Sequence, residues 1–449
     1  METKKKGFPA AFWVCACTEI FERLAYYLGR SLILIFVTAS VATGGLGLSD
    51  TVAANMQSNL TAFSYLLPLF GAVIVDKYIG ARYTTPVGMF IAAAGYFTGG
   101  IAKSATGVYA MIFLVSLGLA LFKNGAIIGR VITDKSQMDP AFSMRYTLVN
   151  VGAFIGTFLV GILYKDVFAK NGVLGFAPCF KMAALMMVLG GLWYIFVCWR
   201  FLGDLGKLPF KKTLTEEEKA AEAKKKEETG TKQPLTTIEK KRIGAIFVAS
   251  LFSIVFWIFW YLGYMPVYFY WAENMDWVVA GYQVPSTWFD AANSLFCVIL
   301  GPVTAALWKK LAARPQGDMS LFRKTGLGIA IIGVGYLFYA VIDIMRGGEK
   351  ASVLWLIVFA FLLTMGEMFF SPLGHSFISK YSPSRYLAVM MSVWGFATFI
   401  AAKSYGPVYG LLFGGKIEFK VACIGVAVVS FAAALIMIAL DKKLSALVD

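Results

Sequence analysis

Four charged side chains stand inside the first apolar run of this chain: Glu19, Glu22, Arg23 and Arg30. At about 100° per residue they fall on one side of a helix, together with the tyrosines between them. A charge near the centre of a bilayer costs about 2.5 kcal/mol or more, so charges there pair with one another and mark an ion or substrate pathway. The alternative is a permanent cluster of salt bridges that only joins helices.

Two further charges, Lys123 and Glu367, lie inside the otherwise uncharged stretches 113–128 and 354–377. With Lys123 included, the first half of the chain has one excess positive charge inside its apolar runs, whereas Glu367 stands alone in the second half. If the halves face each other across a cavity, one wall is cationic and the other anionic. A small zwitterion satisfies both walls. A permanent salt bridge between helices is again the alternative for each charge.

Two asparagines, Asn150 and Asn293, also interrupt apolar runs. An amide side chain donates and accepts hydrogen bonds, which suits an amine or a peptide carbonyl. Both residues are therefore candidates for contact with the same solute.

Membrane-spanning helices are the elements that must position these side chains. With 59% hydrophobic and 15% charged residues, a chain of 449 residues is not an ordinary soluble globule. Apolar runs of about 20 residues, the length that crosses a bilayer, occur in two sets of six around a charged segment. We expect spans near 10–38, 51–75, 84–102, 107–129, 142–164, 179–201, 243–271, 287–308, 325–345, 352–378, 386–410 and 421–440.

The sequence therefore predicts an all-α integral membrane protein of two six-helix bundles. Residues 1–201 form the N-terminal bundle, residues 202–241 a charged cytoplasmic linker, and residues 242–449 the C-terminal bundle. Lys and Arg residues, Arg82 and Arg145 among them, collect on one side if the spans alternate. This side is cytoplasmic by the positive-inside rule, so both termini are expected in the cytoplasm.

Composition argues against several classes of function. The net charge of +15 comes from residues spread along the edges of the spans, so no nucleic-acid partner is expected. One histidine, no clustered metal ligands and no Ser-His arrangement leave no catalytic constellation, so we expect neither an enzyme nor a bound metal. A transporter-like nutrient receptor is an alternative that a turnover measurement would distinguish from a carrier.

The motif Glu19-x-x-Glu22-Arg23-x-x-Tyr26-Tyr27 resembles the first-helix signature of the proton-coupled oligopeptide transporter (POT) family, a branch of the major facilitator superfamily. Further matches follow in the family's order through both halves. They are 64–71, 76–82, Lys123, 142–152, 284–285, Asn293, Pro302, 366–374, Met390, Met391 and Trp394. The resemblance implies the major facilitator fold, with 12 transmembrane helices in two six-helix bundles.

By this resemblance, separate groups of side chains hold the two ends and the side chains of a peptide. Positions that match those holding the amino end are Asn150, Asn293 and Glu367. Positions that match those near the carboxylate are Arg23, Arg30 and Lys123. Positions that match the lining of side-chain pockets are Tyr26, Tyr27, Tyr65 and Trp394, and Ser371 of the tenth-helix motif is a further substrate position.

The resemblance also implies residues for coupling and for conformational change. The expected coupling and salt-bridge residues are Glu19, Glu22, Arg23, Lys123 and Glu367. Without cargo, we expect Glu19 or Glu22 to pair with Lys123. Asp76 and Arg82 match a cytoplasmic loop that keeps the halves in register as they rock.

The family resemblance implies a proton-coupled symporter that imports di- and tripeptides by alternating access. A proton gradient is the energy source and no cofactor is implied. We expect a multi-pass protein of the plasma (inner) membrane that acts as a monomer, with the lipid bilayer, protons and a short peptide as partners. The alternative is the same fold carrying another small solute: nitrate, an amino acid derivative or a peptide-like compound.

The seventh span departs most from the family. In many relatives its segment 256–263 carries Glu and Gln, but here Trp260, Tyr261 and Leu262 occupy it. An acid implicated in coupling or extracellular gating is therefore missing. The bulky replacements predict a smaller or less polar cavity that favours dipeptides, or a restricted set of them, over tripeptides.

Overall fold

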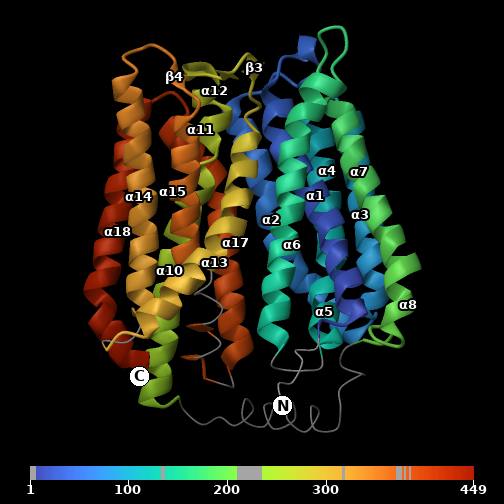
Figure 1. Cartoon of the computed structure of the whole chain (residues 1–449), viewed down its shortest axis with the longest axis vertical. Helices are drawn as coiled ribbons and strands as arrows, with labels where there is room; N and C mark the ends of the chain where they lie inside the picture. Colours follow the sequence, from blue (N-terminus) through green and yellow to red (C-terminus); the bar gives the residue numbers. More distant parts are fainter. Residues whose placement is uncertain are drawn as a thin grey trace. The chain divides into compact units, whose positions relative to one another are not determined.

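The structure, a computed structural model, describes residues 7–132, 137–209, 235–315, 319–370, 377–378, 381–383 and 386–448, apart from the side chains of Asp76, Asp139, Ala388, Leu447 and Val448. Twelve of its helices have 16 residues or more (Figure 1). They are α1 (Ala10–Thr38), α2 (Asp50–Lys77), α3 (Ala81–Ile101), α4 (Ala105–Leu121), α6 (Met138–Ile162), α7 (Phe176–Trp193), α10 (Thr237–Leu262), α13 (Trp288–Ala312), α14 (Leu321–Met345), α15 (Trp355–Phe370), α17 (Leu387–Phe413) and α18 (Phe419–Val448).

Short elements connect or extend these helices. The helical ones are η1 (Val41–Thr43), α5 (Asn124–Val131), η3 (Leu163–Val167), η4 (Tyr194–Cys198), α8 (Trp199–Leu202), α11 (Met265–Tyr268) and α12 (Tyr270–Asn274). The strands are β1 (Met275–Asp276), β2 (Val278–Val279), β3 (Tyr282–Gln283) and β4 (Ala351–Ser352). β1 pairs with β4 in parallel and β2 with β3 antiparallel.

Each of the twelve predicted spans overlaps one long helix, which confirms the all-helical class. Among the described residues, eight helical segments are long and apolar enough to cross a membrane, and the charged α1 is not one of them. α10 begins at Thr237, earlier than predicted. Its start is fixed by a capping box in which Thr236 accepts a bond from the Glu239 N–H and the Glu239 carboxylate accepts one from the Thr236 N–H.

The helices group into two compact units, residues 1–49 with 66–214 and residues 50–65 with 215–449. In unit 1, α1 packs along α6 and α7, and α3 packs along α4 and α7. In unit 2, α14 packs along α18 and α15, α10 along α17 and α18, and α13 along α15 (Figure 1). The predicted bundle boundaries at 201 and 242 stay a prediction, because residues 210–234 lie outside the described part.

The first part of α2 belongs to unit 2 because it packs closely on α17. A side-chain carbon on Gly406 would lie 2.9 Å from the carbonyl oxygen of Ala54, so only glycine permits this approach. Ser58 Oγ donates a hydrogen bond to the carbonyl of Ala402 at 2.7 Å. Small residues allow such close contact of membrane helices, and hydroxyl bonds add to it.

The start of α1 is anchored in the core of unit 1. Phe12 and Cys15 are fully buried there with Tyr194 and Cys198. The indole N–H of Trp193 also donates to the carbonyl of Val14 at 2.9 Å. This packing fixes the face of α1 that carries the charged residues.

Candidate functional site

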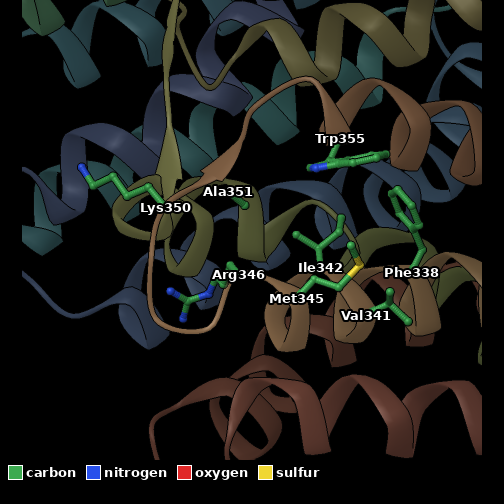
Figure 2. A pocket seen from close by; sticks show the side chains of 8 residues that line it. All are labelled: Phe338, Val341, Ile342, Met345, Arg346, Lys350, Ala351 and Trp355. Carbon is green, nitrogen blue, oxygen red and sulfur yellow. The ribbon is translucent and has the colours of Figure 1, made fainter.

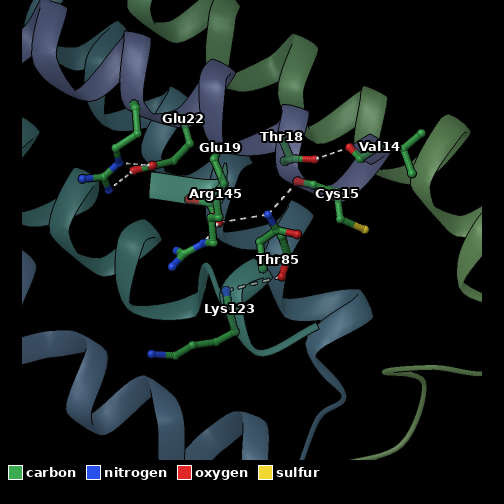
Figure 3. A network of polar contacts seen from close by, with 10 residues as sticks. Val14, Cys15, Thr18, Glu19, Glu22, Thr85, Lys123 and Arg145 are labelled. Carbon is green, nitrogen blue, oxygen red and sulfur yellow. Dashed lines mark hydrogen bonds and ion pairs between the residues drawn. The ribbon is translucent and has the colours of Figure 1, made fainter. Parts of the chain in front are cut away.

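Glu19 joins three helices of unit 1 through one carboxylate oxygen (Figure 3). Its Oε1 accepts from Arg145 Nε on α6 and from Asn124 Nδ2 on α5, each at 3.0 Å. Asn124 Nδ2 also donates to the carbonyl of Cys15 on α1 at 2.8 Å. Glu19 is only 2% exposed. Burying an ion pair is costly, and the additional amide bond offsets part of that cost.

Glu22 is fully buried and pairs with its neighbour Arg23. Arg23 Nη2 donates to Glu22 Oε1 at 2.5 Å, and Arg23 Nε donates to Oε2. The side chain of Arg23 is 26% exposed and its guanidinium lies 4.9 Å from the ring centroid of Tyr26. Arg23 is thus the accessible partner of a bidentate pair whose carboxylate is enclosed.

Lys123 lies at a break in the predicted fourth span. The span was expected to be continuous over 107–129, but α4 ends at Leu121 and α5 begins at Asn124. The backbone N–H of Lys123 donates to Thr85 Oγ1 at 3.4 Å, and its Nζ donates to the carbonyl of Pro68 at 2.7 Å. Arg23 forms an ion pair with Glu22, and Arg145 forms one with Glu19. The expected pairing of a glutamate with Lys123 stays a prediction.

Other candidates of unit 1 lie along α1 and α6. Arg30 is 5% exposed, with its guanidinium 6.0 Å from the ring centroid of Tyr27. The rings of Tyr26 and Tyr27 meet edge to face at 5.4 Å. Asn150 donates to the carbonyl of Tyr146, within its own helix, at 3.0 Å. Unit 1 therefore contains Asn150 but not the other two residues expected at the amino end of a peptide.

Arg82 connects the start of α3 to the segment after α7. Its guanidinium donates to the carbonyl of Gly203 and, at 3.0 Å, to the carbonyl of Trp199. The same group lies 5.0 Å from the ring centroid of Trp199. The side chain of Asp76, the other residue predicted for conformational change, lies outside the described part.

Glu367 on α15 is a buried carboxylate with neutral hydrogen-bond donors. Asn293 Nδ2, from α13, donates to Glu367 Oε2 at 3.3 Å and to Thr364 Oγ1 at 2.8 Å. Cys297 Sγ lies 3.7 Å from the same carboxylate oxygen. The indole N–H of Trp260 is buried and has no hydrogen-bond partner among the described residues. Glu367 is 9% exposed and forms no ion pair with any described residue.

The two aromatic candidates of unit 2 contact other aromatic side chains. Tyr261 OH donates to Tyr65 OH at 3.2 Å. The ring of Trp394 stacks on Phe370 with centroids 6.3 Å apart. Ser371, which follows Phe370, lies outside the described residues.

Sequence reasoning missed four contributors to these contacts. Arg145 was assigned to the cytoplasmic cations, although it stands only three residues inside the predicted span 142–164. Asn124, next to the candidate Lys123, is a hydrogen-bond donor to Glu19 that the sequence did not single out. Thr364 and Cys297 each lie about one helical turn from a recognised residue, Glu367 and Asn293 respectively. That spacing is the signal that could have identified them.

A separate pocket of about 200 Å³ lies where α14 leads into α15 (Figure 2). Its lining residues are Phe338, Val341, Ile342, Met345, Arg346, Lys350, Ala351 and Trp355. Arg346 pairs there with Asp343 at 2.7 Å and donates to Tyr270 OH at 2.7 Å. None of the lining residues is a candidate from the sequence.

Comparison with known proteins yields relatives along most of the chain. The model of the POT family matches residues 203–413. The uncharacterized transporter YclF of Bacillus subtilis is 25% identical, over 89% of this chain and 87% of the relative. A di-/tripeptide transporter of Lactococcus lactis subsp. cremoris is 24% identical, over 86% of each chain.

Solved structures of POT transporters share the fold. One POT family transporter in complex with 5-aminolevulinic acid has a TM-score of 0.85 and 24% identity, with 98% of each chain covered. A peptide transporter POT in complex with sulfate has a TM-score of 0.86 and 23% identity, covering 99% of this chain and 97% of the other. The chain is therefore a multi-pass, all-helical membrane protein with the fold of POT family transporters, and its residues 203–413 match the model of that family.

Proposed function

We propose that this transporter is a proton-coupled symporter that imports short peptides across the plasma membrane, with both termini in the cytoplasm. One observation carries the proposal. Glu367 is buried, bonded to neutral donors, and without an ion pair among the described residues. A carboxylate in such surroundings needs a cation or a proton, and the ammonium of a peptide supplies a cation.

Unit 1 carries charge of the opposite sign. Its candidate charges comprise two buried carboxylates, Glu19 and Glu22, and four cations, of which Arg30 is buried and Arg23, Lys123 and Arg145 are partly exposed. A cargo carboxylate balances part of this excess. A short peptide offers an ammonium and a carboxylate within a few residues, at up to about 3.6 Å per residue. Relatives named as di-/tripeptide transporters support the same cargo.

Proton coupling follows from competition for Arg23. The guanidinium is partly exposed, whereas the Glu22 carboxylate that it binds is fully enclosed. When a cargo carboxylate binds Arg23, Glu22 loses its counter-ion and binds a proton, because an unpaired charge at that depth is unfavourable. Proton and cargo then stabilise the same state, so each raises the affinity for the other.

An amino acid derivative is the second candidate cargo. The relative solved with 5-aminolevulinic acid binds a small molecule that has both an amine and a carboxylate. Such a solute would satisfy the same two sets of charges. Nitrate, which has no amine, would leave Glu367 without a counter-charge.

Uptake into proteoliposomes tests the proposal. An inward proton gradient with a negative interior should drive accumulation of a labelled dipeptide above its external concentration, and a proton ionophore should abolish it. Unlabelled dipeptide, 5-aminolevulinic acid and nitrate serve as competitors. Accumulation of nitrate without any uptake of peptide or aminolevulinic acid would overturn the proposal.

A further inference from the structure

The pocket where α14 leads into α15 has a cationic part and an apolar part. Figure 2 shows the side chains of Arg346 and Lys350 on one side of the lining and those of Phe338, Val341 and Trp355 on the other. None of the lining residues carries a carboxylate. An occupant that matches this lining combines a negatively charged group with an apolar chain.

The two parts of the pocket lie at different depths of a membrane-spanning segment. The span formed by α14 ends at Met345, so Phe338 lies inside it and Arg346 directly follows it. At 1.5 Å per residue, these two positions are about 12 Å apart along the helix axis. The pocket therefore reaches from the hydrocarbon into the headgroup region. Tryptophan is enriched at this boundary in membrane proteins, and Trp355 lines the pocket there.

Exposed apolar side chains flank the pocket on both helices. Val341 and Met345 are exposed on α14, and Trp355 and Val358 are exposed on α15. Exposed apolar groups on a membrane-spanning segment are favourable against acyl chains and unfavourable against water. The apolar part of the pocket is therefore open to lipid chains.

The guanidinium of Arg346 is held in place for an anion. Its Nε donates to Asp343 at 2.7 Å, its Nη1 to the carbonyl of Glu349 at 3.1 Å, and its Nη2 to Tyr270 OH at 2.7 Å. A guanidinium has five N–H donors, so these three bonds leave two for a ligand. A fixed guanidinium with free donors suits the oxygens of a phosphate group.

The charges around the pocket favour one negative group. Asp343 pairs with Arg346 and offsets its charge. Lys350 is exposed and forms no ion pair with any described residue. Glu349 is exposed and is not among the lining residues. The lining thus keeps one positive charge without a counter-charge, and the long side chain of Lys350 can carry it to the headgroup level.

We propose that this pocket binds an anionic phospholipid. The phosphodiester lies between Arg346 and Lys350, and the upper part of one acyl chain packs on Phe338, Val341 and Trp355. A phospholipid fits better than a free phosphate because the apolar part of the lining has no use for a fully hydrated ion. The site is separate from the candidate cargo site, since Trp355 stands three helical turns before Glu367 on α15.

Native mass spectrometry of the full chain in a neutral detergent tests the inference. The probes are dioleoyl phosphatidylglycerol, dioleoylglycerol, which lacks the phosphate, and glycerol 3-phosphate, which lacks the acyl chains. Phosphatidylglycerol should bind about 5-fold more tightly than dioleoylglycerol, or better, and should raise the unfolding temperature. Equal binding of the two dioleoyl lipids would overturn the inference, and so would binding of glycerol 3-phosphate as tight as that of phosphatidylglycerol.

Substitutions assign the binding to this pocket. Lys350→Ala removes the uncompensated charge and should weaken phosphatidylglycerol about 5-fold, with little effect on dioleoylglycerol. Its control is Lys416→Ala, which removes an exposed lysine from the loop between α17 and α18. Val341→Trp fills the apolar part and should weaken both lipids. Its control is Val334→Trp, at an exposed position of α14 two turns away and outside the lining.

The replaced side chains are exposed, so each variant should unfold near the temperature of the parent when no lipid is added. Unchanged binding of phosphatidylglycerol in both Lys350→Ala and Val341→Trp would overturn the inference. A loss of binding in Lys416→Ala or Val334→Trp as large as in the pocket variants would also overturn it, because the lipid would then be held by the general surface of the helices. None of these results depends on the cargo.

Discussion

Asn293 donates its amide N–H to the carboxylate of Glu367 at 3.3 Å, and this bond joins α13 to α15 across 74 residues of sequence. The same nitrogen donates to Thr364 Oγ1 at 2.8 Å, which orients the amide. An amide holds the carboxylate in place without neutralising it. The charge of Glu367 is thereby left for a cargo cation or a proton.

Replacing Glu367 with Gln should remove recognition of the cargo amine while preserving the shape of the side chain. Losing one partner of a desolvated charge pair costs about 2–5 kcal/mol. Free dipeptides should therefore bind about 30-fold more weakly or worse, while N-acetylated dipeptides lose little. Isothermal titration with purified protein measures both.

Asp290→Asn is the matched control for that substitution. Asp290 is another buried carboxylate of unit 2, 6% exposed, and it accepts a hydrogen bond from Tyr268. The Asp290→Asn substitution should lower the unfolding temperature without changing the discrimination between free and N-acetylated peptides. Equal binding of free peptide by Glu367→Gln and the parent would make Glu367 purely structural.

Lys123→Ala should weaken recognition of the cargo carboxylate. The ammonium of Lys123 lies at the break between α4 and α5, where it donates to the carbonyl of Pro68 at 2.7 Å. Binding of a free dipeptide should fall at least tenfold more than binding of its C-terminal amide. Lys324→Ala is the control, because Lys324 is a buried lysine that packs on Trp308 in unit 2. Equal losses for acid and amide would count against this role of Lys123.

Arg145→Met should destabilise the protein rather than alter its cargo. The substitution leaves the buried carboxylate of Glu19 without its ion-pair partner, which costs about 3–5 kcal/mol. The double variant with Glu19→Gln removes the stranded charge and should recover much of the loss in unfolding temperature. If the loss of stability in the double variant equals the sum of the losses in the two single variants, the two residues are not coupled.

Glu22→Gln should uncouple transport from the proton gradient. Without a titratable group beside Arg23, cargo binding has no proton to take up, but the movement of the carrier remains possible. Accumulation driven by an imposed pH gradient should disappear while peptide-for-peptide exchange continues. Glu19→Gln serves as the comparison, since Arg145 rather than Arg23 holds Glu19. Undiminished accumulation by both variants would leave Glu367 as the candidate for coupling.

Trp260→Ala should widen the range of peptide lengths. The indole of Trp260 on α10 occupies space near Glu367. Its removal leaves room into which a longer cargo could extend. Tripeptides should compete better relative to dipeptides of matched composition in the variant than in the parent. A parent protein that already takes both lengths equally would refute the predicted preference for dipeptides.

The sequence by itself determined the helical class and the location of the chemistry. Apolar runs of about 20 residues form helices in a bilayer, because their backbone N–H and C=O groups must form hydrogen bonds within the same segment. Charges inside such runs are so costly that Glu19, Glu22, Arg23 and Glu367 become candidate site residues before any distance between side chains is known.

Only the tertiary structure decided which charges pair. The helical period predicts which residues of one helix are neighbours. A partner on another helix depends on how the two helices pack and rotate, which sequence spacing does not encode. Hence Arg145 binds Glu19, and Asn293 bonds to Glu367. The break at Lys123 has the same origin. The Lys123 N–H bonds to Thr85 on α3 in place of a helical bond, and the Asn124 side chain bonds to α1, in a run whose composition favours a continuous helix.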